Sequence, residues 1–333
     1  MKRVAVIGAG NWGTALGVVA ARAGHEVRLW SRNPEVVEAI NHQHVNSLYL
    51  PDAQLPGDVR ASGDIAEVLE QADLVIIATP SHATRAVLET MVPRLDPNMI
   101  FVSATKGIEV ETGKRISQIV DEVVGDKFSP RFVCLSGPSF AKEVLEKHPT
   151  AVVAASRDDA LSREVQADLS FESLRIYTND DLVGTELGGS TKNVMAIAAG
   201  MVAGLGFGSN SVAALITRGL AEMTRLALSQ GAKLETMMGL AGLGDLVLTC
   251  TGSLSRNRFV GQELGKGRNI RDITAGMNEV AEGVKTTLAL KRLADHLRVQ
   301  MPITEEVYGV IYDGKTAGEA ATQLMTRPLR GEF

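Results

Sequence analysis

The stretch Val4-Ala5-Val6-Ile7-Gly8-Ala9-Gly10-Asn11-Trp12-Gly13 decides the expected fold. Four apolar residues, typical of a buried strand, lead directly into the pattern G-x-G-x-x-G, and a helical pattern comes next. In dinucleotide-binding proteins these glycines allow a tight turn, close approach of the backbone to a pyrophosphate, and close packing of helix on strand. An ordinary glycine turn is the alternative. The position between a strand and a helix favours the nucleotide site.

The region after this turn alternates between β-rich runs and helical patterns. We expect strands at 3–7, 26–30, 74–78, 100–104, 132–135 and 151–155, with helices such as 14–23 and 115–124 between them. In the second of these helices, apolar residues recur at i, i+3, i+4 and i+7 from Ile116 and so share one face. This alternation is typical of βαβ units. We therefore expect a Rossmann-like α/β fold with a doubly wound, mainly parallel sheet.

After residue 179 the strand patterns fade, and helical spacing of Ala, Leu and Met dominates. Expected helices lie at 182–203, 212–229, 257–264, 284–296 and 303–312. A chain of 333 residues also exceeds the size at which one hydrophobic core usually keeps growing. We expect two domains: an NAD(P)-binding Rossmann-like domain over 1–180 and an all-α C-terminal domain, for substrate binding and catalysis, over 181–333.

Composition limits the partners and the location of the protein. With 34 Lys and Arg against 39 Asp and Glu, the formal net charge is −5 at pH 7, whereas nucleic-acid binding usually needs a basic excess. We expect no nucleic acid partner. Cys134 and Cys250 are too few for a disulfide framework, and no signal-peptide pattern precedes the first expected strand. The expected location is the cytoplasm.

Residues 193–217 contain no charge, and a stretch of this length could span a bilayer. Gly200, Gly204, Gly206 and Gly208 interrupt it, and the polar residues 209–211 come directly after them. We interpret the stretch as two buried helical pieces joined by a turn, and we expect no membrane insertion.

The second expected strand ends in Trp30-Ser31-Arg32-Asn33, where NAD-specific sites usually have an Asp or Glu for the ribose 2′-hydroxyl. A carboxylate would repel a 2′-phosphate, whereas Arg32 can pair with one. We therefore expect NADP as well as NAD to be accepted and leave the preference open. A solvated surface arginine is the alternative.

Four further segments combine small residues with isolated polar or charged residues, as expected of site loops. They are 103–107, 136–141, 241–250 and 255–258. The first two lie just past expected strand ends, which is where open α/β sheets bind ligands.

Lys192 is an isolated charge in the apolar helical pattern that begins near residue 182. A lysine is rarely buried without a partner, and its pKa shifts readily on desolvation, as proton transfer at neutral pH requires. The alternative is a lysine whose amine extends to solvent from a helix end. This helix alone leaves both interpretations open.

Taken together, these segments resemble the bacterial glycerol-3-phosphate dehydrogenase (NAD(P)+) family over nearly the whole chain. The matching motifs are 4–10, Ala104-Thr105-Lys106-Gly107, Ser136-Gly137-Pro138, Lys192-Asn193, Gly242-Leu243-Gly244-Asp245-Leu246, Ser255-Arg256-Asn257 and 302–306. The resemblance implies reversible, NAD(P)H-dependent reduction of dihydroxyacetone phosphate to sn-glycerol 3-phosphate, which supplies glycerophospholipid synthesis. It also implies a homodimer.

The resemblance implies roles for individual residues as well. Lys192 stands at the position of the proton acceptor and donor, and Lys106 stands where the family contacts both cofactor and substrate. The implied cofactor-binding residues are Gly8, Gly10, Asn11, Trp12, Gly13, Arg32, Lys106, Ala141, Arg256, Val280 and Glu282. The implied substrate-binding residues are Lys106, Gly137, Ser139, Lys192, Asp245, Thr249, Ser255, Arg256 and Asn257.

The chemistry agrees with these roles. Negative charge develops on the C2 carbonyl oxygen of the substrate during reduction, and the Lys192 ammonium can stabilise it and deliver a proton. The guanidinium of Arg256 suits the substrate phosphate, and Asn257 can supply another donor. Asp245 could hold a substrate hydroxyl or orient Lys192.

Two alternatives stay open at this point. A two-domain dehydrogenase of the 3-hydroxyacid or 6-phosphogluconate type shares the nucleotide domain, but it lacks the combination of 242–246 with 255–257. A non-catalytic NAD(P)-binding sensor should have lost Lys192 or Lys106, and both are present. We expect no metal, because the six histidines form no cluster with ligand spacing.

Overall fold

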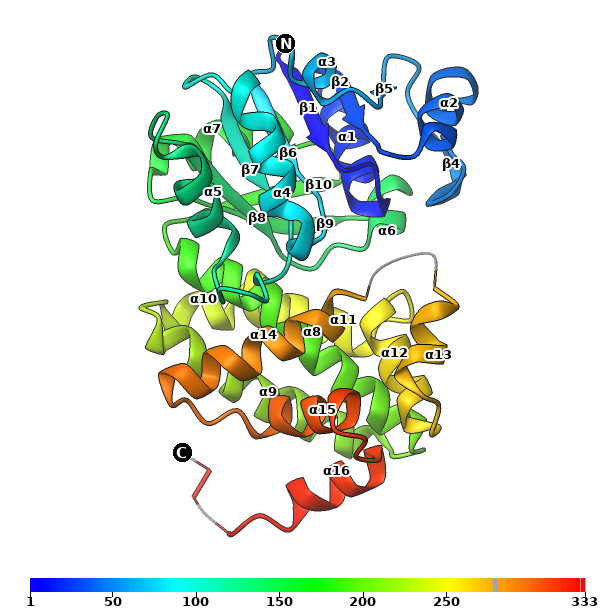
Figure 1. The fold of residues 1–333 in the computed structure, drawn as a ribbon, viewed down its shortest axis with the longest axis vertical. Coiled ribbons are helices and arrows are strands. Elements are labelled where there is room, and N and C mark those ends of the chain that lie inside the picture. Colours follow the sequence, from blue (N-terminus) through cyan, green and yellow to red (C-terminus); the bar gives the residue numbers. More distant parts are fainter. Residues whose placement is uncertain (278–280, 330, 333) are drawn as a thin grey trace. The chain divides into compact units, whose positions relative to one another are not determined.

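The computed structural model describes residues 1–277, 281–329, 331 and 332. The chain divides into two compact units, coloured along the sequence in Figure 1. Unit 1 comprises Met1–Lys106 and Lys114–Glu186, and unit 2 comprises Gly107–Gly113 and Leu187–Phe333. The domain boundary expected after residue 180 stays a prediction. The compact unit around the sheet extends to Glu186 and excludes residues 107–113.

Unit 1 contains an eight-stranded sheet in the order β10-β9-β8-β7-β6-β1-β2-β5. The strands are β1 (Arg3–Ile7), β2 (Glu26–Trp30), β5 (Arg60–Ser62), β6 (Leu74–Ile77), β7 (Ile100–Ser103), β8 (Arg131–Ser136), β9 (Thr150–Ala155) and β10 (Leu174–Asn179). All neighbouring strands pair in parallel except β8 and β9, which are antiparallel. The expected Rossmann-like, mainly parallel sheet is confirmed. The strands β5 and β10 were not expected.

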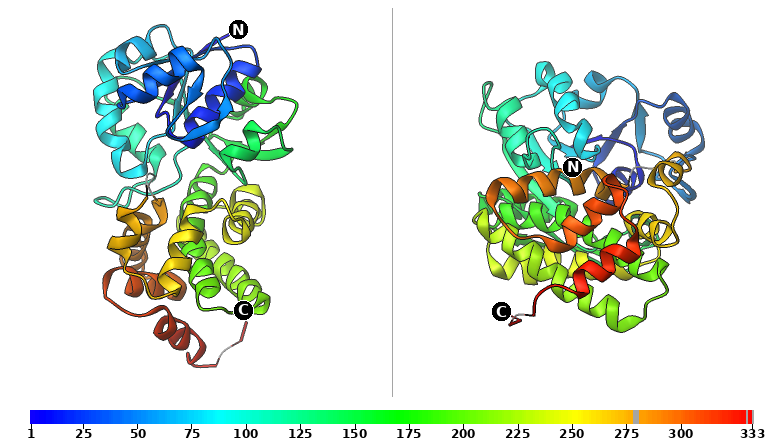
Figure 2. Two further views of the ribbon diagram at one scale, coloured as in Figure 1. Left: turned by 90° about the vertical axis from the view of Figure 1, so that its right-hand side faces the viewer. Right: turned by 60° about the horizontal axis from the view of Figure 1, so that its bottom comes forward.

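Helices cover both faces of this sheet (Figures 1 and 2). They are α1 (Asn11–Arg22), α2 (Pro34–Gln43), α3 (Ile65–Leu69), α4 (Ser81–Met91), α5 (Ile116–Val124), α6 (Ala141–Leu145) and α7 (Asp159–Leu169), with a 3-10 turn η1 (Val92–Arg94) and a small hairpin of β3 (Val45–Asn46) and β4 (Leu50–Gln54).

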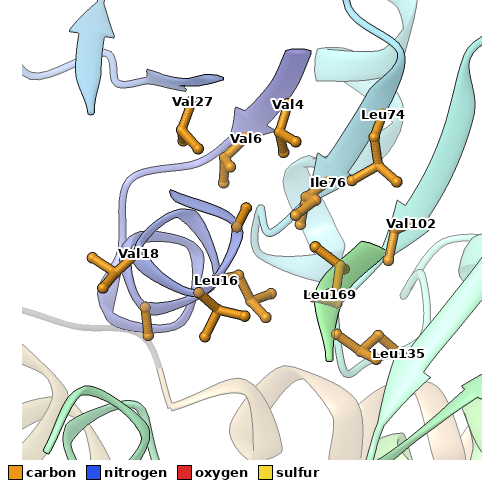
Figure 3. Packing of buried hydrophobic residues seen from close by; sticks show 14 of the residues in the cluster. Val4, Val6, Leu16, Val18, Val27, Leu74, Ile76, Val102, Leu135 and Leu169 are labelled. Carbon is orange, nitrogen blue, oxygen red and sulfur yellow. The ribbon is translucent and has the colours of Figure 1, made fainter. Parts of the chain in front are cut away.

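The sheet has a hydrophobic core on each face, as alternation along β1 requires. Val4 and Val6 belong to the cluster that includes α1, α2 and α7, whereas Ala5 and Ile7 belong to the cluster that includes α3, α4 and α5. Figure 3 shows Leu16 of α1 among side chains from β1 and β6. A strand buried on both faces is continuously apolar, which is why these strands could be recognised in the sequence.

The regular secondary structure in the described residues of unit 2 is helical, so the expected all-α fold is confirmed. Its helices are α8 (Leu182–Gly204, which begins in unit 1), α9 (Ser209–Ser229), α10 (Leu234–Met238), α11 (Asp245–Thr251), α12 (Arg256–Gly265), α13 (Ile270–Ala275), α14 (Glu282–Leu297), α15 (Pro302–Tyr312) and α16 (Ala317–Met325), with a π-helical turn η2 (Leu240–Gly244).

The turn expected within the uncharged stretch is shorter than the glycine pattern suggested. Gly206, with φ +76°, lies between α8 and α9, but Gly200 and Gly204 lie inside α8. A Cβ on Gly200 would lie 2.0 Å from the carbonyl oxygen of Arg258, and a Cβ on Gly204 would lie 2.3 Å from that of Gln262. The two helical glycines therefore serve close packing of α8 on α12 rather than a turn.

No single helix in the described part of the chain is both long and apolar enough to cross a membrane. Within the same described residues, one pair of helical segments, Leu234–Thr251 and Arg256–Gly265, is long and apolar enough when taken together, but it is bent by 50°.

Candidate active site

The turn after β1 contains glycines whose missing side chains the structure requires. Gly8 has φ +117°, and a Cβ there would lie 2.8 Å from the carbonyl oxygen of Ala78. A Cβ on Gly13 would lie 1.9 Å from the carbonyl oxygen of Gly8. At Gly10, by contrast, a Cβ would meet nothing within 4 Å. The turn is tight at both ends and open in the middle, which lets backbone N–H groups approach a pyrophosphate.

Two buried polar atoms beside this turn have no hydrogen-bond partner among the described residues. They are Oδ1 of Asn11 and Nε1 of Trp12, at the start of α1. Such atoms are costly unless a ligand or water pairs with them. Asn46 steadies the turn, because its Nδ2 donates to the carbonyl oxygen of Ala9 at 2.9 Å and to Oγ1 of Thr14 at 2.8 Å. The open turn and the unpaired atoms fit a dinucleotide.

Arg32 is exposed just after the carboxyl end of β2. It lines a pocket of about 320 Å³ together with Ser31, Pro34, Val37, Glu38, Asn41, His42 and Gly63. Asn33, the next residue, accepts a hydrogen bond from the backbone of Glu35 at 2.9 Å and so caps α2. The arginine therefore projects from a fixed corner beside a pocket, which suits recognition of a phosphate.

Lys106 lies at a second corner, beyond the carboxyl ends of β7 and β8. Its Nζ donates to the carbonyl oxygen of Gly137 at 2.9 Å, and Oγ of Ser139 donates to the same oxygen at 3.0 Å. Gly137 has φ +132°, and a Cβ there would lie 3.0 Å from Cα of Val152. Ala141 comes next as the first residue of α6. Three of the expected residues, Lys106, Gly137 and Ser139, thus meet at one point.

The two corners of unit 1 are separated by the width of the sheet between them. In the order β8-β7-β6-β1-β2, three strand spacings separate β7 from β2. At about 4.8 Å per spacing, the strand before Lys106 lies roughly 14 Å from the strand before Arg32. The glycine turn after β1 lies between the two. The expected cofactor residues of unit 1 therefore form an extended row along one edge of the sheet, and this row includes the point where strand order reverses.

In unit 2, Lys192 is buried with two of the expected residues. Its Nζ lies 3.1 Å from Oδ1 of Asp245 and donates to Oγ1 of Thr249 at 2.7 Å. Lys192 is 8% exposed, Asp245 1% and Thr249 2%. The hydroxyl of Thr249 in turn donates to the carbonyl oxygen of Asp245 at 2.7 Å. Because a buried ammonium needs a compensating charge, the carboxylate explains how a lysine is held inside this helical unit.

The close contact between α8 and η2 brings these groups together. A Cβ on Gly188 would lie 2.5 Å from the carbonyl oxygen of Ala241, so the two backbones touch there. Lys192 lies four residues after Gly188 and therefore on the same face of α8, one turn further along. Asp245 directly succeeds η2. Such π-helical turns are frequent at functional sites.

The segment 255–257 forms the start of α12. Oγ of Ser255 accepts from the backbone of Arg258 at 3.2 Å and caps the helix, and Arg256, which is exposed, is its first residue. A helix N-terminus with an arginine is a favourable place for a phosphate.

Asn257 joins three helices rather than pointing only to a ligand. Its Nδ2 donates to Oδ1 of Asn193 on α8 at 2.9 Å, and its Oδ1 accepts from the backbone of Gly283 on α14 at 2.9 Å. Glu282 is the first residue of α14, and Val280 lies outside the described residues. The cofactor roles of both stay predictions.

Neither cysteine supplies a thiolate. Burial raises the pKa of the Cys250 thiol to about 12, and it raises the pKa of Cys134 well above its usual range. Both thiols are protonated at neutral pH, which excludes them as nucleophiles. The described residues contain no group of three or more histidine, cysteine or carboxylate side chains placed to hold a metal.

Sequence reasoning missed three buried polar residues near these sites: Asn46, Arg115 and Glu186. Arg115 and Glu186 form an ion pair, and Asn46 supports the glycine turn. The available signal for Glu186 was the same as for Lys192, since it is an isolated charge in an otherwise apolar helix.

Comparison with known proteins points in one direction. Residues 3–162 match the model of the NAD-dependent glycerol-3-phosphate dehydrogenase N-terminus, and residues 181–322 match that of its C-terminus. The chain is 54% identical over 330 residues to glycerol-3-phosphate dehydrogenase (NAD(P)+) of Koribacter versatilis, covering 98% of each chain. It is 49% identical over 331 residues to that of Geobacter sulfurreducens, covering 99% of each.

The fold is similar to a solved structure as well. The crystal structure of glycerol-3-phosphate dehydrogenase from Coxiella burnetii has a TM-score of 0.94 to this chain at 39% identity. The match covers 98% of this chain and 99% of that one.

Proposed function

We propose that this chain, which belongs to the NAD-dependent glycerol-3-phosphate dehydrogenase family, interconverts dihydroxyacetone phosphate and sn-glycerol 3-phosphate. A nicotinamide dinucleotide is the redox partner. The observation that supports this most directly is the buried ammonium of Lys192, held in the helical unit by the carboxylate of Asp245 and the hydroxyl of Thr249. A buried, paired lysine at that position is suited to moving a proton.

Lys192 exchanges the proton with the substrate oxygen. The bound coenzyme, when reduced, supplies the hydride for C2 of the ketone, and the negative charge that develops on oxygen is met by the ammonium at Nζ. Lys192 then donates one proton, and in the oxidative direction its neutral amine accepts the proton of the hydroxyl. Asp245 and Thr249 orient Nζ, because their oxygens lie 3.1 and 2.7 Å from it.

The substrate phosphate is held by the start of α12. Arg256 offers a planar guanidinium that engages two oxygens, and the N–H groups of the first helical turn add their own donors. Ser255 holds the helix start in place through its cap. Lys106, Gly137 and Ser139, which meet in unit 1, contact the substrate, and Lys106 contacts the coenzyme as well.

The coenzyme is held by the glycine turn, by Asn11 and Trp12 beside it, by Ala141 at the start of α6, and by Glu282 at the start of α14. Val280 is proposed as a further coenzyme-binding residue. Arg32 pairs with the 2′-phosphate of NADP, and NAD is accepted without that contact. No metal takes part in the reaction.

The protein works in the cytoplasm as a homodimer, binds neither nucleic acid nor membrane, and supplies glycerophospholipid synthesis. Membership of the family supports these parts of the proposal.

The test is oxidation of NADPH and of NADH followed spectrophotometrically with dihydroxyacetone phosphate, in the wild type and in Lys192→Met. We expect the variant to lower kcat by roughly 10²- to 10⁴-fold, the usual loss for a positioned acid–base group. Binding of NADPH, measured by fluorescence titration, should not change.

Lys291→Met is the matched control, since Lys291 on α14 also contacts an aspartate, Asp295 at 2.6 Å, but its side chain is partly exposed. It should retain full turnover. Near-normal kcat in Lys192→Met would rule out its role. Equal rates with dihydroxyacetone lacking the phosphate would rule out the substrate.

A further inference from the structure

The chain passes between the two units three times, after Lys106, after Gly113 and after Glu186. A buried ion pair joins the unit 1 ends of the second and third passages. Arg115 lies two residues after the second passage, and Glu186 is the last residue before the third. Both side chains are buried, with Arg115 8% and Glu186 6% exposed as residues. The pair thus lies where the backbone leaves and enters unit 1.

The carboxylate of Glu186 is bound by several donors at the start of α5. Nη1 of Arg115 donates to its Oε2, as does Oγ of Ser117 at 2.7 Å, and the backbone N–H of Ser117 donates to Oε1 at 2.7 Å. Nη1 of Arg115 also donates to Oγ of Ser117 at 3.1 Å. The carboxylate therefore caps α5 from another helix, α8, and its position is fixed in several directions at once.

Stability alone is a weak reason for such a pair. Burial raises the pKa of Glu186, although Arg115 and Ser117 oppose this effect. Replacing a buried ion pair by apolar residues of similar size is often neutral or stabilising. Directional hydrogen bonds fix the rotation and register of a helix, whereas apolar contacts do not.

The register of α8 at Glu186 matters for a residue further along the same helix. Lys192 lies six residues beyond Glu186, about 9 Å at 1.5 Å per residue. Gly188 and Gly189 lie between them, and glycines make a helix locally less stable. This less stable stretch of α8 lies between two ion pairs. One joins Glu186 to Arg115, and the other joins Lys192 to Asp245.

We propose that Arg115 and Glu186 are positioning residues that fix the start of α8 on α5 and so determine the direction in which Lys192 presents its amine. The segment that contains Lys106 leads into Arg115, so the same pair also ties the stretch of chain that comes after Lys106 to the start of α8. This inference rests on the proposed function of Lys192.

The experiment compares Arg115→Met, Glu186→Gln and the double variant Arg115→Met/Glu186→Leu. Each single variant leaves a buried charge without its counter-charge and should lower Tm. The double variant removes both charges and should regain most of that Tm. Its kcat should nevertheless stay roughly 10- to 100-fold low, as expected for a misplaced catalytic group, while KM for NADPH is unchanged. The pH profile of kcat should also move.

Arg85→Met/Glu122→Leu is the matched control. It removes the same residue types, joined at 2.7 Å between α4 and α5, but at a more exposed place. Both Tm and kcat should stay close to the wild type.

A double variant with wild-type Tm and kcat within twofold would overturn the proposal, as would a loss of kcat that only parallels the loss of folded protein. If the double variant does not fold, kcat of Glu186→Gln is measured well below the Tm of that variant. A kcat within twofold of the wild type would then overturn the proposal. Failure of the proposed function is distinguishable, because it would appear as normal turnover in Lys192→Met, whatever the pair does.

Discussion

The expected binding groups of the two units differ in kind, since those of unit 1 are largely backbone groups and those of unit 2 are side chains. In unit 1 the expected site consists of backbone at the carboxyl ends of strands, shaped by Gly8, Gly13 and Gly137, where side chains would collide with neighbouring backbone. In unit 2 it consists of side chains that meet across helices, above all Lys192, Asp245 and Thr249. On the proposed assignment, unit 1 would recognise the coenzyme largely through shape and backbone N–H groups, whereas unit 2 would supply the reactive amine.

This difference governs how each unit tolerates change. A turn whose glycines contact backbone cannot accept a methyl group, because main chain cannot move aside like a side chain. A side-chain cluster can lose one member and keep its fold while losing chemistry. Substitutions at the turn glycines of unit 1 should therefore lower both stability and coenzyme binding. Substitutions in the side-chain cluster of unit 2 should lower turnover before they affect stability.

The largest effect is expected for Gly13→Ala. Its Cβ would lie 1.9 Å from the carbonyl oxygen of Gly8, so the turn must open, at a cost of roughly 1–3 kcal/mol or more. Thermal unfolding should show a lower Tm, and KM for NADPH should rise strongly.

Gly10→Ala is its matched partner. Nothing lies within 4 Å of the added Cβ, and the backbone φ of −77° suits alanine, so Tm should not change. The space it fills is where a pyrophosphate would approach, so KM for NADPH should still rise, by about tenfold. Unchanged KM in this variant would mean that the open middle of the turn is not used.

A smaller effect, confined to turnover, is expected for Thr249→Val. The change removes the hydroxyl that accepts from Nζ of Lys192 at 2.7 Å. A lost hydrogen bond to a charged group costs about 1–3 kcal/mol, or roughly 5- to 150-fold in kcat.

Thr251→Val separates the ammonium contact from helix effects. Thr251 makes the same bond to the carbonyl four residues earlier, at 2.8 Å, as Thr249 does at 2.7 Å, but it is exposed. Its kcat should be normal. Equal losses in both variants would assign the effect to the helix instead of to Lys192.

Arg32→Asp should change coenzyme preference without changing the chemistry. A carboxylate at this corner repels a 2′-phosphate and can accept from a ribose hydroxyl, so the ratio of kcat/KM for NADPH over NADH should fall by about tenfold or more. Arg60→Asp, an exposed arginine at the start of β5, should leave the ratio as it is. The assignment of Arg32 fails if both variants behave alike.

The smallest effect is expected at the rim of unit 1, for Glu164→Gln. Hydrogen bonds and charge from Lys2, at 2.7 Å, and Arg131, at 2.9 Å, hold the pKa of Glu164 below its usual value of 4.5. Because the pKa of Glu164 is lower in the folded than in the unfolded chain, its ion pairs stabilise the fold above about pH 4.5. This stabilisation is lost as the pH falls through the folded pKa.

The variant should lower the free energy of unfolding by under about 1 kcal/mol at pH 7, because the group is partly exposed. The difference should vanish in acid. Glu172→Gln, at an exposed glutamate of the same unit, provides the baseline, and a difference that persists below the folded pKa would contradict the ion-pair origin.

The sequence predicted the central strands because they are buried on both faces and continuously apolar. Strand β10 was missed, since its burial alternates and Arg175 and Tyr177 are exposed. Strand β5 has only three residues, Arg60–Ser62, too few for a pattern. Glycines were interpreted correctly at the turn after β1, but Gly200 and Gly204 could not be distinguished from turn glycines without knowing that α12 packs against them.

In the site, too, the sequence predicts local conformation but not which distant residues come into contact. The glycine turn is contiguous in sequence, so its conformation depends on local chemistry. The contact of Lys192 with Thr249 spans 57 residues and that of Asn257 with Asn193 spans 64, and periodicity says nothing about which helices meet. The family resemblance supplied these residues as a set. It did not supply the Arg115–Glu186 pair, whose partners lie 71 residues apart.

The contact of α8 with α12 has a consequence for how this enzyme can change over evolutionary time. At Gly200 and Gly261 main chain rests on main chain, so there is no intermediate side-chain size through which substitutions could proceed by small steps. A substitution at either glycine would therefore separate the two helices rather than adjust their packing slightly. Adaptation to a new temperature or a new substrate must therefore arise elsewhere, in helices whose contacts consist of exchangeable side chains.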